Sequence, residues 1–415
     1  MSRPTTLNEI VRKLDRRRES PHFVVRYAER NPRSGPGNGS HGIRGDRLIS
    51  LYLDALEKAY RMLTDRFGRG PPRVGKEGKT LVLVLDVSQF VNGLYPFTFD
   101  DRTFGPVVGL LSHTHEPTTD GELQRACLDA VHEVGHVFNF TDRPARDAYS
   151  KNWIWIDEAS AVLLERLVFP ENVDVCRYGK IWCDSPELPL DSGRGHYEAA
   201  QFLWYLYRSF GPGLLGQVWR DARDYPRERP LETVRRLLLA HGETLLSPNK
   251  PDVFGSGYCV ASYFLLDKKS TMFAEQLFER HGDRAVTRSE IIMPGKAPVE
   301  IFGSLDHLAC NYYRFSPGPR ATKLFLTVAA EPRDGRQPPL KATVVRVEER
   351  LRQKGEPVTL DVQGPRTTPV FHDFEASKLD HAVLVVANCG DRAYTGRPDV
   401  PHDDDYPFKV SARAE

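Results

Sequence analysis

The residues of this chain with the clearest capacity for chemistry are two histidines and a glutamate inside an apolar stretch. Residues 131–140 read Val-His-Glu-Val-Gly-His-Val-Phe-Asn-Phe. Because positions i and i+4 share one face of a helix, His132 and His136 can direct two imidazoles at a single metal ion. Glu133, next to the first histidine, is placed to act as a general base. The spacing therefore predicts a helix that binds one Zn²⁺ ion per chain.

A hydrolytic zinc site also needs a third protein ligand, with one coordination position kept for water. Residues 153–166 offer that ligand, since they have the apolar spacing of a helix and carry Glu158 near its start. The chain between the two segments allows one reversal, so the two helices can lie antiparallel. The sequence thus predicts His132, His136 and Glu158 as the metal ligands.

The two segments resemble the zinc sites of the gluzincin metallopeptidases, most closely those of the M1 family of aminopeptidases. The second zinc helix of that family reads Trp-Leu-Asn-Glu-Gly, and a further glutamate follows the ligand by seven residues. This chain has Glu165 at that later position, and around the ligand it reads Trp155-Ile156-Asp157-Glu158-Ala159. The resemblance implies the same ligands and base, and implies that Glu165 orients a ligand histidine. The thermolysin branch usually has an aspartate where this chain has Val162, and it resembles the chain less.

A third segment extends the resemblance to the oxyanion that forms when water attacks a carbonyl. Residues 194–211 resemble the Tyr-Glu-Lys-Gly helix of the same family, whose tyrosine hydroxyl stabilises that oxyanion. The resemblance implies that Tyr197 is the oxyanion donor. Two alanines follow the Tyr-Glu pair here in place of Lys-Gly, and two alternative donors are His196 and Tyr258.

One motif of these aminopeptidases is missing from the chain. They carry Gly-x-Met-Glu-Asn on the strand before the zinc helix, and its glutamate holds the free amine of the substrate. The corresponding strand, residues 107–113, has no acidic residue, although it can pair with an extended peptide by edge addition. We therefore expect a zinc metallopeptidase that cleaves peptide or protein substrates as an endopeptidase rather than as an aminopeptidase.

Two functions of other classes are compatible with the same residues. One is a non-peptidase zinc hydrolase that acts on an amide, an ester or an epoxide in a biosynthetic pathway. The other is a non-catalytic binding protein on a metallopeptidase fold. The complete set of metal ligands and general base in this chain argues against the second alternative.

The elements that must position the site form a small sheet with helices packed on it. β-Branched and aromatic runs predict strands over residues 22–28, 80–87 and 106–112, and a loop rich in Gly, Pro, Ser and Asn over residues 31–46. Helical spacing over residues 46–67 predicts a helix that ends at Gly68. The zinc helix should begin near Thr119 or Asp120, either of which is a suitable cap, and should end between residues 139 and 144.

The remaining chain is predicted to be helical up to about residue 300 and then rich in short strands. Helical spacing occurs at 214–222, 231–239, 256–266 and 273–281, and strands are expected at 310–315, 324–329, 342–347, 358–362, 370–374, 381–388 and 408–412. The predicted fold class is α+β. The resemblance implies a thermolysin-like, two-lobed peptidase domain, with an α/β lobe over 1–125 and the zinc helices and a helical lobe over 126–300. A β-sandwich over 301–415 follows.

The composition excludes several classes of partner. The chain has 57 Lys and Arg against 56 Asp and Glu, so no strong charge favours nucleic acid or an acidic membrane. No stretch of the sequence is long and apolar enough to predict a membrane span. The first residues have no apolar signal core, and the chain as written is predicted to be cytoplasmic, or secreted if it is a processed form.

The six cysteines do not predict a disulfide framework, because they are few for 415 residues and none has Cys-x-x-Cys spacing. We expect reduced and mostly buried thiols. Whether Cys310 pairs with Cys389 is left open by the sequence.

Overall fold

The structure of the protein is a computed structural model, which describes fourteen parts of the chain. These are residues 6–28, 46–85, 96–111, 119–143, 153–170, 185–191, 196–247, 250–263, 286–331, 338–348, 352–360, 362, 370–390 and 406–415. The chain divides into two compact units. The first comprises residues 1–175 and 209–230, and the second comprises residues 176–208 and 231–415. Helices and three sheets together make an α+β protein, as predicted.

The first unit is built on a five-stranded sheet with the strand order β1-β2-β3-β5-β4. Its strands are β1 (Arg16–Glu19), β2 (Phe23–Tyr27), β3 (Thr80–Leu85), β4 (Phe97–Asp101) and β5 (Gly105–Leu111). The three central strands run parallel, and β1 and β4 are antiparallel to their neighbours. The predictions of β2, β3 and β5 are confirmed, whereas β1 and β4 were not predicted.

The position of β5 corrects one expectation. Residues 107–113 were expected to offer a free edge to a peptide, but β5 pairs with β3 on one side and with β4 on the other. The outermost strand next to β5 is β4. Its residues, Phe-Thr-Phe-Asp-Asp, end in two acids, which are depleted in strands, so the sequence carries no clear strand signal there.

Alternation along the strands sends side chains to two differently covered faces. Helix α1 (Leu7–Lys13) covers one face, where its Ile10 and Val11, with Leu14 just after the helix, share a hydrophobic cluster with alternate residues of β3 and with Val107 of β5. Phe97 and Phe99 pack against the same cluster. Thr98, between them, must therefore point to the opposite face, which carries the zinc helix.

Helix α2 (Asp46–Arg61) continues as a π-helical turn, η1 (Met62–Arg66), before the chain leaves it at Gly68. Gly68 has a φ of 63°, a conformation that side chains disfavour, and this explains why the helix ends there. The predicted helix over residues 46–67 is confirmed.

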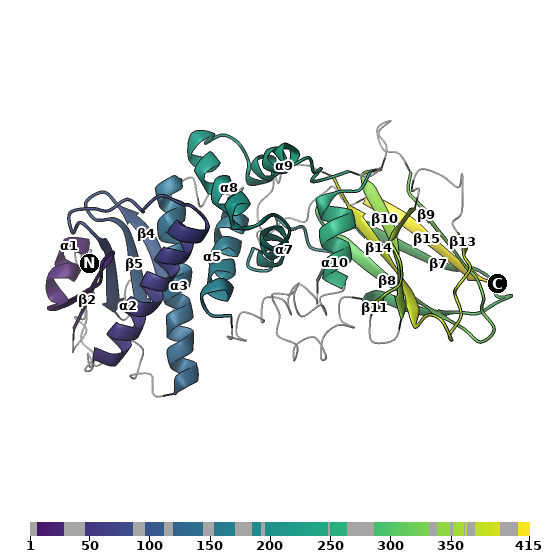
Figure 1. Cartoon of the computed structure of the whole chain (residues 1–415), viewed down its shortest axis with the longest axis horizontal. Coiled ribbons are helices and arrows are strands. Elements are labelled where there is room, and N and C mark those ends of the chain that lie inside the picture. Colours follow the sequence, from purple (N-terminus) through teal and green to yellow (C-terminus); the bar gives the residue numbers. More distant parts are fainter. Residues whose placement is uncertain are drawn as a thin grey trace, which may run out of the picture. The chain divides into compact units, whose positions relative to one another are not determined.

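Helix α3 (Asp120–Asp142) carries the zinc motif and runs alongside α2 and α5 (Figure 1). Its N-cap is Thr119, whose hydroxyl accepts the N–H of Glu122 at 3.2 Å, while the Glu122 carboxylate accepts the N–H of Thr119 at 3.1 Å. This reciprocal capping box satisfies two backbone donors and confirms the predicted start of the helix.

Helix α5 (Ile154–Val168) lies antiparallel to α3, as predicted. His132 contacts Glu165, whereas Asn139, two turns further on, contacts Asp157. The two helices approach closely at Gly135, where an added Cβ would lie 3.1 Å from the backbone of Ala161. Glycine at this position, between the two histidines, lets α5 bring its acidic residues next to the imidazoles.

The remaining helices lie around residues 200–263. They are α7 (Ala200–Phe210), α8 (Pro212–Asp224), α9 (Pro230–Ala240), a π-helical turn η3 (Val253–Cys259) and α10 (Val260–Tyr263). Helix α8 belongs to the first unit, where the indole of Trp219 donates to the Ser160 hydroxyl on α5 at 3.2 Å. The predictions over 214–222 and 231–239 are confirmed. The predicted loop at 31–46 falls almost entirely outside the described residues, and the predicted helix at 273–281 lies wholly outside them.

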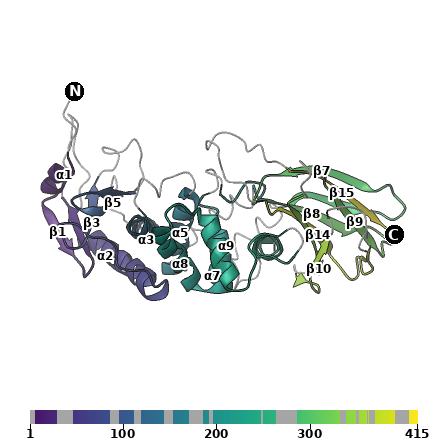
Figure 2. The same cartoon turned by 90° about the horizontal axis from the view of Figure 1, so that it is seen from above.

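Two sheets form most of the second unit, and Figure 2 shows their strands in green and yellow. One sheet has the order β11-β10-β14-β8-β6, with β12 also paired to β10, and the other has the order β13-β9-β15-β7. Their strands are β6 (Val286–Ile292), β7 (Val299–Leu305), β8 (Cys310–Pro317), β9 (Leu324–Ala329), β10 (Leu340–Glu348), β11 (Arg352–Gln353), β12 (Val358–Leu360), β13 (Val370–Phe371), β14 (His381–Asn388) and β15 (Tyr406–Ala414).

Residues of both sheets share one hydrophobic core, which includes Tyr313, Leu326, Val344, Leu384 and Val410. Every strand predicted after residue 308 is present in the structure. The sequence missed β6 and β7. The residues of β6 are mostly exposed and do not alternate in burial. Those of β7 do alternate, but Phe302 is on the exposed side and Gly303 on the inward side, so the alternation is hidden in the sequence.

Four described cysteines are free and buried: Cys127, Cys259, Cys310 and Cys389. Cys310 and Cys389 therefore do not pair, which answers the question that the sequence left open. The Cys310 thiol contacts the Tyr312 hydroxyl, and the Cys389 thiol contacts Asp252. Among the helices that the structure describes, none has the length and apolar character to cross a membrane.

Candidate metal centre

The three residues predicted as metal ligands lie together. The ligand atoms of His132, His136 and Glu158 are all within 4.8 Å of one another. Oε2 of Glu158 lies 3.1 Å from Nε2 of His132 and 3.6 Å from Nε2 of His136. The two imidazoles come from one face of α3, and the carboxylate comes from the first turns of α5.

A carboxylate lies beside the other nitrogen of each imidazole, as a hydrogen-bond partner at His132 and at ion-pair distance, without a hydrogen bond, at His136. Nδ1 of His132 lies 2.6 Å from Oε1 of Glu165, which is the contact expected from the resemblance. Nδ1 of His136 lies 3.1 Å from Oδ1 of Asp157. With both Nδ1 atoms facing acids, both Nε2 atoms face Glu158, and this is the arrangement of histidines that bind a metal through Nε2.

Asp157 was not predicted as a site residue. The signal that could have identified Asp157 was its position directly before the ligand glutamate, where the aminopeptidase motif has an asparagine. Asp157 is fully buried. Its Oδ1 accepts the side-chain N–H of Asn139 at 2.5 Å, while its Oδ2 has no hydrogen-bond partner within the described part of the chain.

Glu133 is buried beside the two histidines and is fixed by a residue that the sequence did not indicate. The Thr98 hydroxyl lies 2.6 Å from Oε2 of Glu133 and 3.1 Å from the backbone carbonyl of the same residue. Thr98 reaches Glu133 because it is the residue of β4 whose side chain points toward α3. Because β4 was missed, nothing in the sequence pointed to Thr98.

The ionisable groups of the site shift one another in a consistent direction. Burial lowers the pKa of His132, but its hydrogen bonds to Glu158 and Glu165 outweigh this effect and raise that pKa to about 10. The acids around His136 likewise overcome burial and raise its pKa. Burial opposes the ionisation of Glu158, yet the two imidazoles hold the pKa of Glu158 below its usual range. The acids of this site thus stabilise positive charge at the two imidazoles.

The donor set fits a divalent cation such as Zn²⁺. The carboxylates of Asp157, Glu158 and Glu165 lie within 3.6 Å of a ring nitrogen of the two imidazoles. The buried carboxylate of Glu133 interacts electrostatically with both histidines. Neutral imidazoles would leave this buried group with a large negative charge, which is costly without a balancing cation. Two imidazole nitrogens and one carboxylate oxygen are ligands that zinc prefers.

Tyr197 was expected on a helix, and this was wrong. Helix α7 begins at Ala200, and residues 196–199 form the turn before it. The N–H of Ala200 bonds to the carbonyl of Tyr197, three residues back, and the next two residues repeat this pattern. These tight bonds belong to a 3₁₀-type start that precedes the α-helix. Tyr197 belongs to the second unit, and its role as oxyanion donor stays a prediction.

The two alternative oxyanion donors differ in their surroundings. The ring of His196 lies 4.6 Å from the ring of Tyr197, in the same turn. Tyr258 is buried in η3, where its ring packs against Phe202 and Phe254. Tyr258 is therefore part of the core of the second unit.

Comparison with models of known protein families and with curated proteins finds no match to this sequence.

Proposed function

We propose that this protein is a zinc-dependent peptidase, with His132, His136 and Glu158 as metal ligands and Glu133 as general base. The observation that carries the proposal is the convergence of three ligand atoms within 4.8 Å beside a buried carboxylate that is not a ligand. No fourth histidine, cysteine or acid joins that group within the described ranges. Structural zinc sites use four protein ligands, whereas three ligands leave room for a reacting molecule.

The residues of the chain account for the movement of protons. A bound zinc ion would supply a Lewis acid that acidifies water and polarises the scissile carbonyl. Glu133 accepts the proton that the attacking water loses and delivers it to the leaving nitrogen. The hydroxyl of Thr98 donates to Oε2 of Glu133, so Oε1 is the oxygen left to accept the proton from water. Burial raises the pKa of Glu133, so the carboxylate has a greater affinity for the proton it must accept.

The neighbouring strand favours a peptide as the substrate. β4 is the outermost strand of its sheet among the described residues, and a peptide in extended form can add to such an edge. Because Thr98 of β4 contacts Glu133, a peptide paired with β4 would pass beside the general base. We propose Tyr197 as the oxyanion donor, by resemblance alone.

The acids of β4 favour internal cleavage over removal of an N-terminal residue. Asp100 forms an ion pair with Arg73. Asp101 accepts the backbone N–H groups of Thr103 and Phe104, at 2.7 and 3.0 Å. Both acids are already engaged within the protein, so neither is free to hold the amino group of a substrate, as an aminopeptidase requires.

The test is cleavage of a mixed peptide library by purified, zinc-loaded protein, read by mass spectrometry with and without a chelator. We expect chelator-sensitive cleavage within peptides. Glu133→Gln should keep one zinc ion and lose about 10²–10⁴-fold in turnover, since a positioned general base contributes that much. Activity retained by this variant would contradict the assignment of the base.

Glu122→Gln is a matched control on the same helix. Glutamine can replace glutamate in the capping box, so this variant should keep both zinc and activity. If the wild-type protein binds zinc and cleaves no peptide, the proposed peptidase is wrong, and a non-peptidase zinc hydrolase or a binding protein takes its place.

A further inference from the structure

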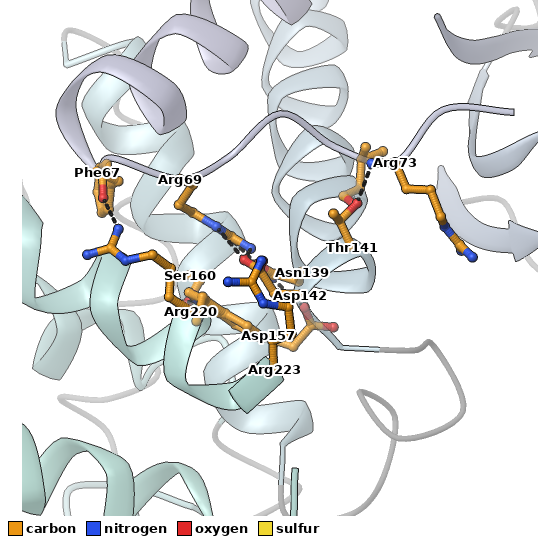
Figure 3. A network of polar contacts seen from close by, with 12 residues as sticks. Phe67, Arg69, Arg73, Asn139, Thr141, Asp142, Asp157, Ser160, Arg220 and Arg223 are labelled. Atoms are coloured by element: carbon orange, nitrogen blue, oxygen red, sulfur yellow. Dashed lines mark hydrogen bonds and ion pairs between the residues drawn. The ribbon is translucent and has the colours of Figure 1, made fainter. Parts of the chain in front are cut away.

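A continuous row of buried polar side chains leads from Asp157, beside His136, through Asn139 to Arg69. Figure 3 shows Asp157, Asn139 and Arg69. Nη1 of Arg69 donates to Oδ1 of Asn139 at 2.7 Å. Nδ2 of Asn139 donates to Oδ1 of Asp157 at 2.5 Å, and that oxygen lies 3.1 Å from Nδ1 of His136. The proposed catalytic mechanism does not use Arg69 or Asn139, yet the two residues and Asp157 are at most 4% exposed.

Arg69 decides which way the amide of Asn139 points. A guanidinium can only donate hydrogen bonds, and a carboxylate can only accept them. The oxygen of Asn139 must therefore face Arg69, and its NH₂ group must face Asp157. With the amide reversed, a donor would meet a donor at Arg69 and an acceptor would meet an acceptor at Asp157.

Asn139 in turn holds the carboxylate that faces His136. Within the described part of the chain, the only hydrogen bond to the Asp157 carboxylate comes from Asn139, because Oδ2 has none. A carboxylate beside Nδ1 favours the tautomer with its proton on that nitrogen. Nε2 of His136 then carries the lone pair that faces Glu158.

Arg69 is itself held rigidly. Its Nε and Nη2 donate to Oδ2 of Asp142 at 3.0 and 2.6 Å, so its charge is balanced without Asp157. The guanidinium lies 5.4 Å from the ring of Phe138 and 5.2 Å from the ring of Trp219. These contacts leave the planar group little freedom to turn away from Asn139.

We propose that Arg69 and Asn139 are positioning residues of the metal centre, which act through Asp157 to set the orientation and tautomer of His136. The proposal rests on the zinc site of the proposed function. The two residues do not touch the ligand atoms. Their effect should therefore be seen in the affinity for zinc.

Asn139→Leu tests the proposal, because leucine has a similar size and cannot form either hydrogen bond. We expect the zinc dissociation constant, measured by competition with a chromophoric chelator, to rise about 10–100-fold, as for other partners of ligand histidines. The visible spectrum of the Co²⁺-loaded protein should change with it. Arg69→Met should act in the same direction.

Arg220→Met is the matched control. Arg220 also binds this segment, since its Nη1 donates to the carbonyl of Gly68 at 2.7 Å, but it does not contact Asn139. Its loss should lower the stability of the fold and leave zinc affinity and the Co²⁺ spectrum unchanged. Because Asn139→Leu can fail to fold, Asn139→Asp is a second variant of the same shape, which presents an oxygen to Asp157 and should also weaken zinc binding.

The outcomes separate this proposal from the proposed function. A wild-type protein that binds no zinc overturns both. A wild-type protein that binds zinc, together with Asn139→Leu or Asn139→Asp variants of unchanged affinity, overturns the positioning role alone. An equal loss of affinity in Arg220→Met would also overturn it, because general destabilisation of the segment would then explain the effect.

Discussion

Each of the two units buries a cluster of ionisable side chains, and the two clusters differ in how their charges are balanced. In the second unit, Lys341 and Asp252 form an ion pair of 3.0 Å, with both side chains at most 1% exposed. Lys341 also donates to the carbonyls of Ser247 and Lys250. Asp252 accepts the N–H groups of Ser247 and Ser256, at 2.9 and 2.8 Å. One charge meets one opposite charge, and hydrogen bonds complete the pair.

The candidate metal centre of the first unit lacks this balance. Acids outnumber the imidazoles they contact, and Oδ2 of Asp157 is buried without a hydrogen-bond partner in the described part of the chain. Burial of charged side chains, which both clusters share, does not by itself mark a functional site. The pair of Lys341 and Asp252 has equal and opposite charges and complete hydrogen bonds, so it serves to join two parts of a fold. A cluster with more acids than cations, whose lone pairs converge, is suited to bind an added cation.

The largest effect should come from removing a ligand of the unbalanced cluster. His132→Ala should lose the bound zinc and all turnover, because two remaining ligands hold the ion poorly. Elemental analysis of the purified protein measures this directly. His22→Ala is the control, because His22 also contacts a glutamate, with Nδ1 2.8 Å from Oε2 of Glu57, but lies outside the cluster. One zinc ion per chain in His132→Ala would show that the ligand set is wrong.

Breaking the balanced pair should affect stability and leave the metal in place. Lys341→Met leaves Asp252 buried without its cation, which costs about 3–5 kcal/mol of unfolding free energy. Denaturant unfolding measures the loss, and zinc content should stay at one ion per folded chain. Lys409→Met, which removes a surface ion pair with Glu300, should cost about 0–1 kcal/mol. If folded Lys341→Met lost zinc, the distinction between a structural ion pair in the second unit and a metal-binding cluster in the first would fail.

The smallest effect should come from the hydroxyl that holds the general base. Thr98→Val keeps the shape of the side chain and loses its hydrogen bond to Glu133. Since a hydrogen bond to a charged group is worth about 1.5–3 kcal/mol, kcat should fall by about 10–100-fold. This bond lowers the pKa of Glu133, so its loss raises that pKa. The acidic limb of the kcat/KM profile should therefore move to higher pH.

Thr80→Val is the control for this variant. Thr80 is a buried threonine of the same sheet, and its hydroxyl has no hydrogen-bond partner among the described residues. Its replacement should leave kcat and the pH profile unchanged. An unchanged pH profile in Thr98→Val would contradict the proposed contact between Thr98 and the ionised form of Glu133.

The parts of the site that sequence predicted are those set by local periodicity. The spacing of His132 and His136 on one helix, and the position of Glu158 near the start of the next, follow from the geometry of single helices. The contact between Glu165 and His132 was implied by the resemblance to the M1 aminopeptidases, and the antiparallel packing of α3 and α5 brings the two side chains together. A reader of the sequence can reach these residues without knowing how the sheet is ordered.

The residues that sequence missed reach the site through long-range packing. Thr98 depends on β4, a short strand whose place in the sheet decides which of its side chains face α3. Arg69 depends on where the chain turns after η1, and Asn139 looks like one more residue of an apolar helix. Tyr197 was placed on a helix because residues 194–211 resemble the Tyr-Glu-Lys-Gly helix, whereas the structure has a 3₁₀-type turn there and begins the α-helix after it.

In the proposed zinc site, Gly135 would bear on which ion is accepted. Its missing side chain sets the distance between α3 and α5, and hence the span between the imidazoles of one helix and the carboxylate of the other. A methyl group here would meet Ala161 at 3.1 Å and push the helices apart by a few tenths of an ångström. Zinc–ligand bonds of about 2.0–2.2 Å tolerate little widening, whereas calcium takes oxygen ligands at about 2.3–2.6 Å. In the proposed zinc site, the close approach of α3 and α5 at Gly135 would therefore favour a small ion over a larger one.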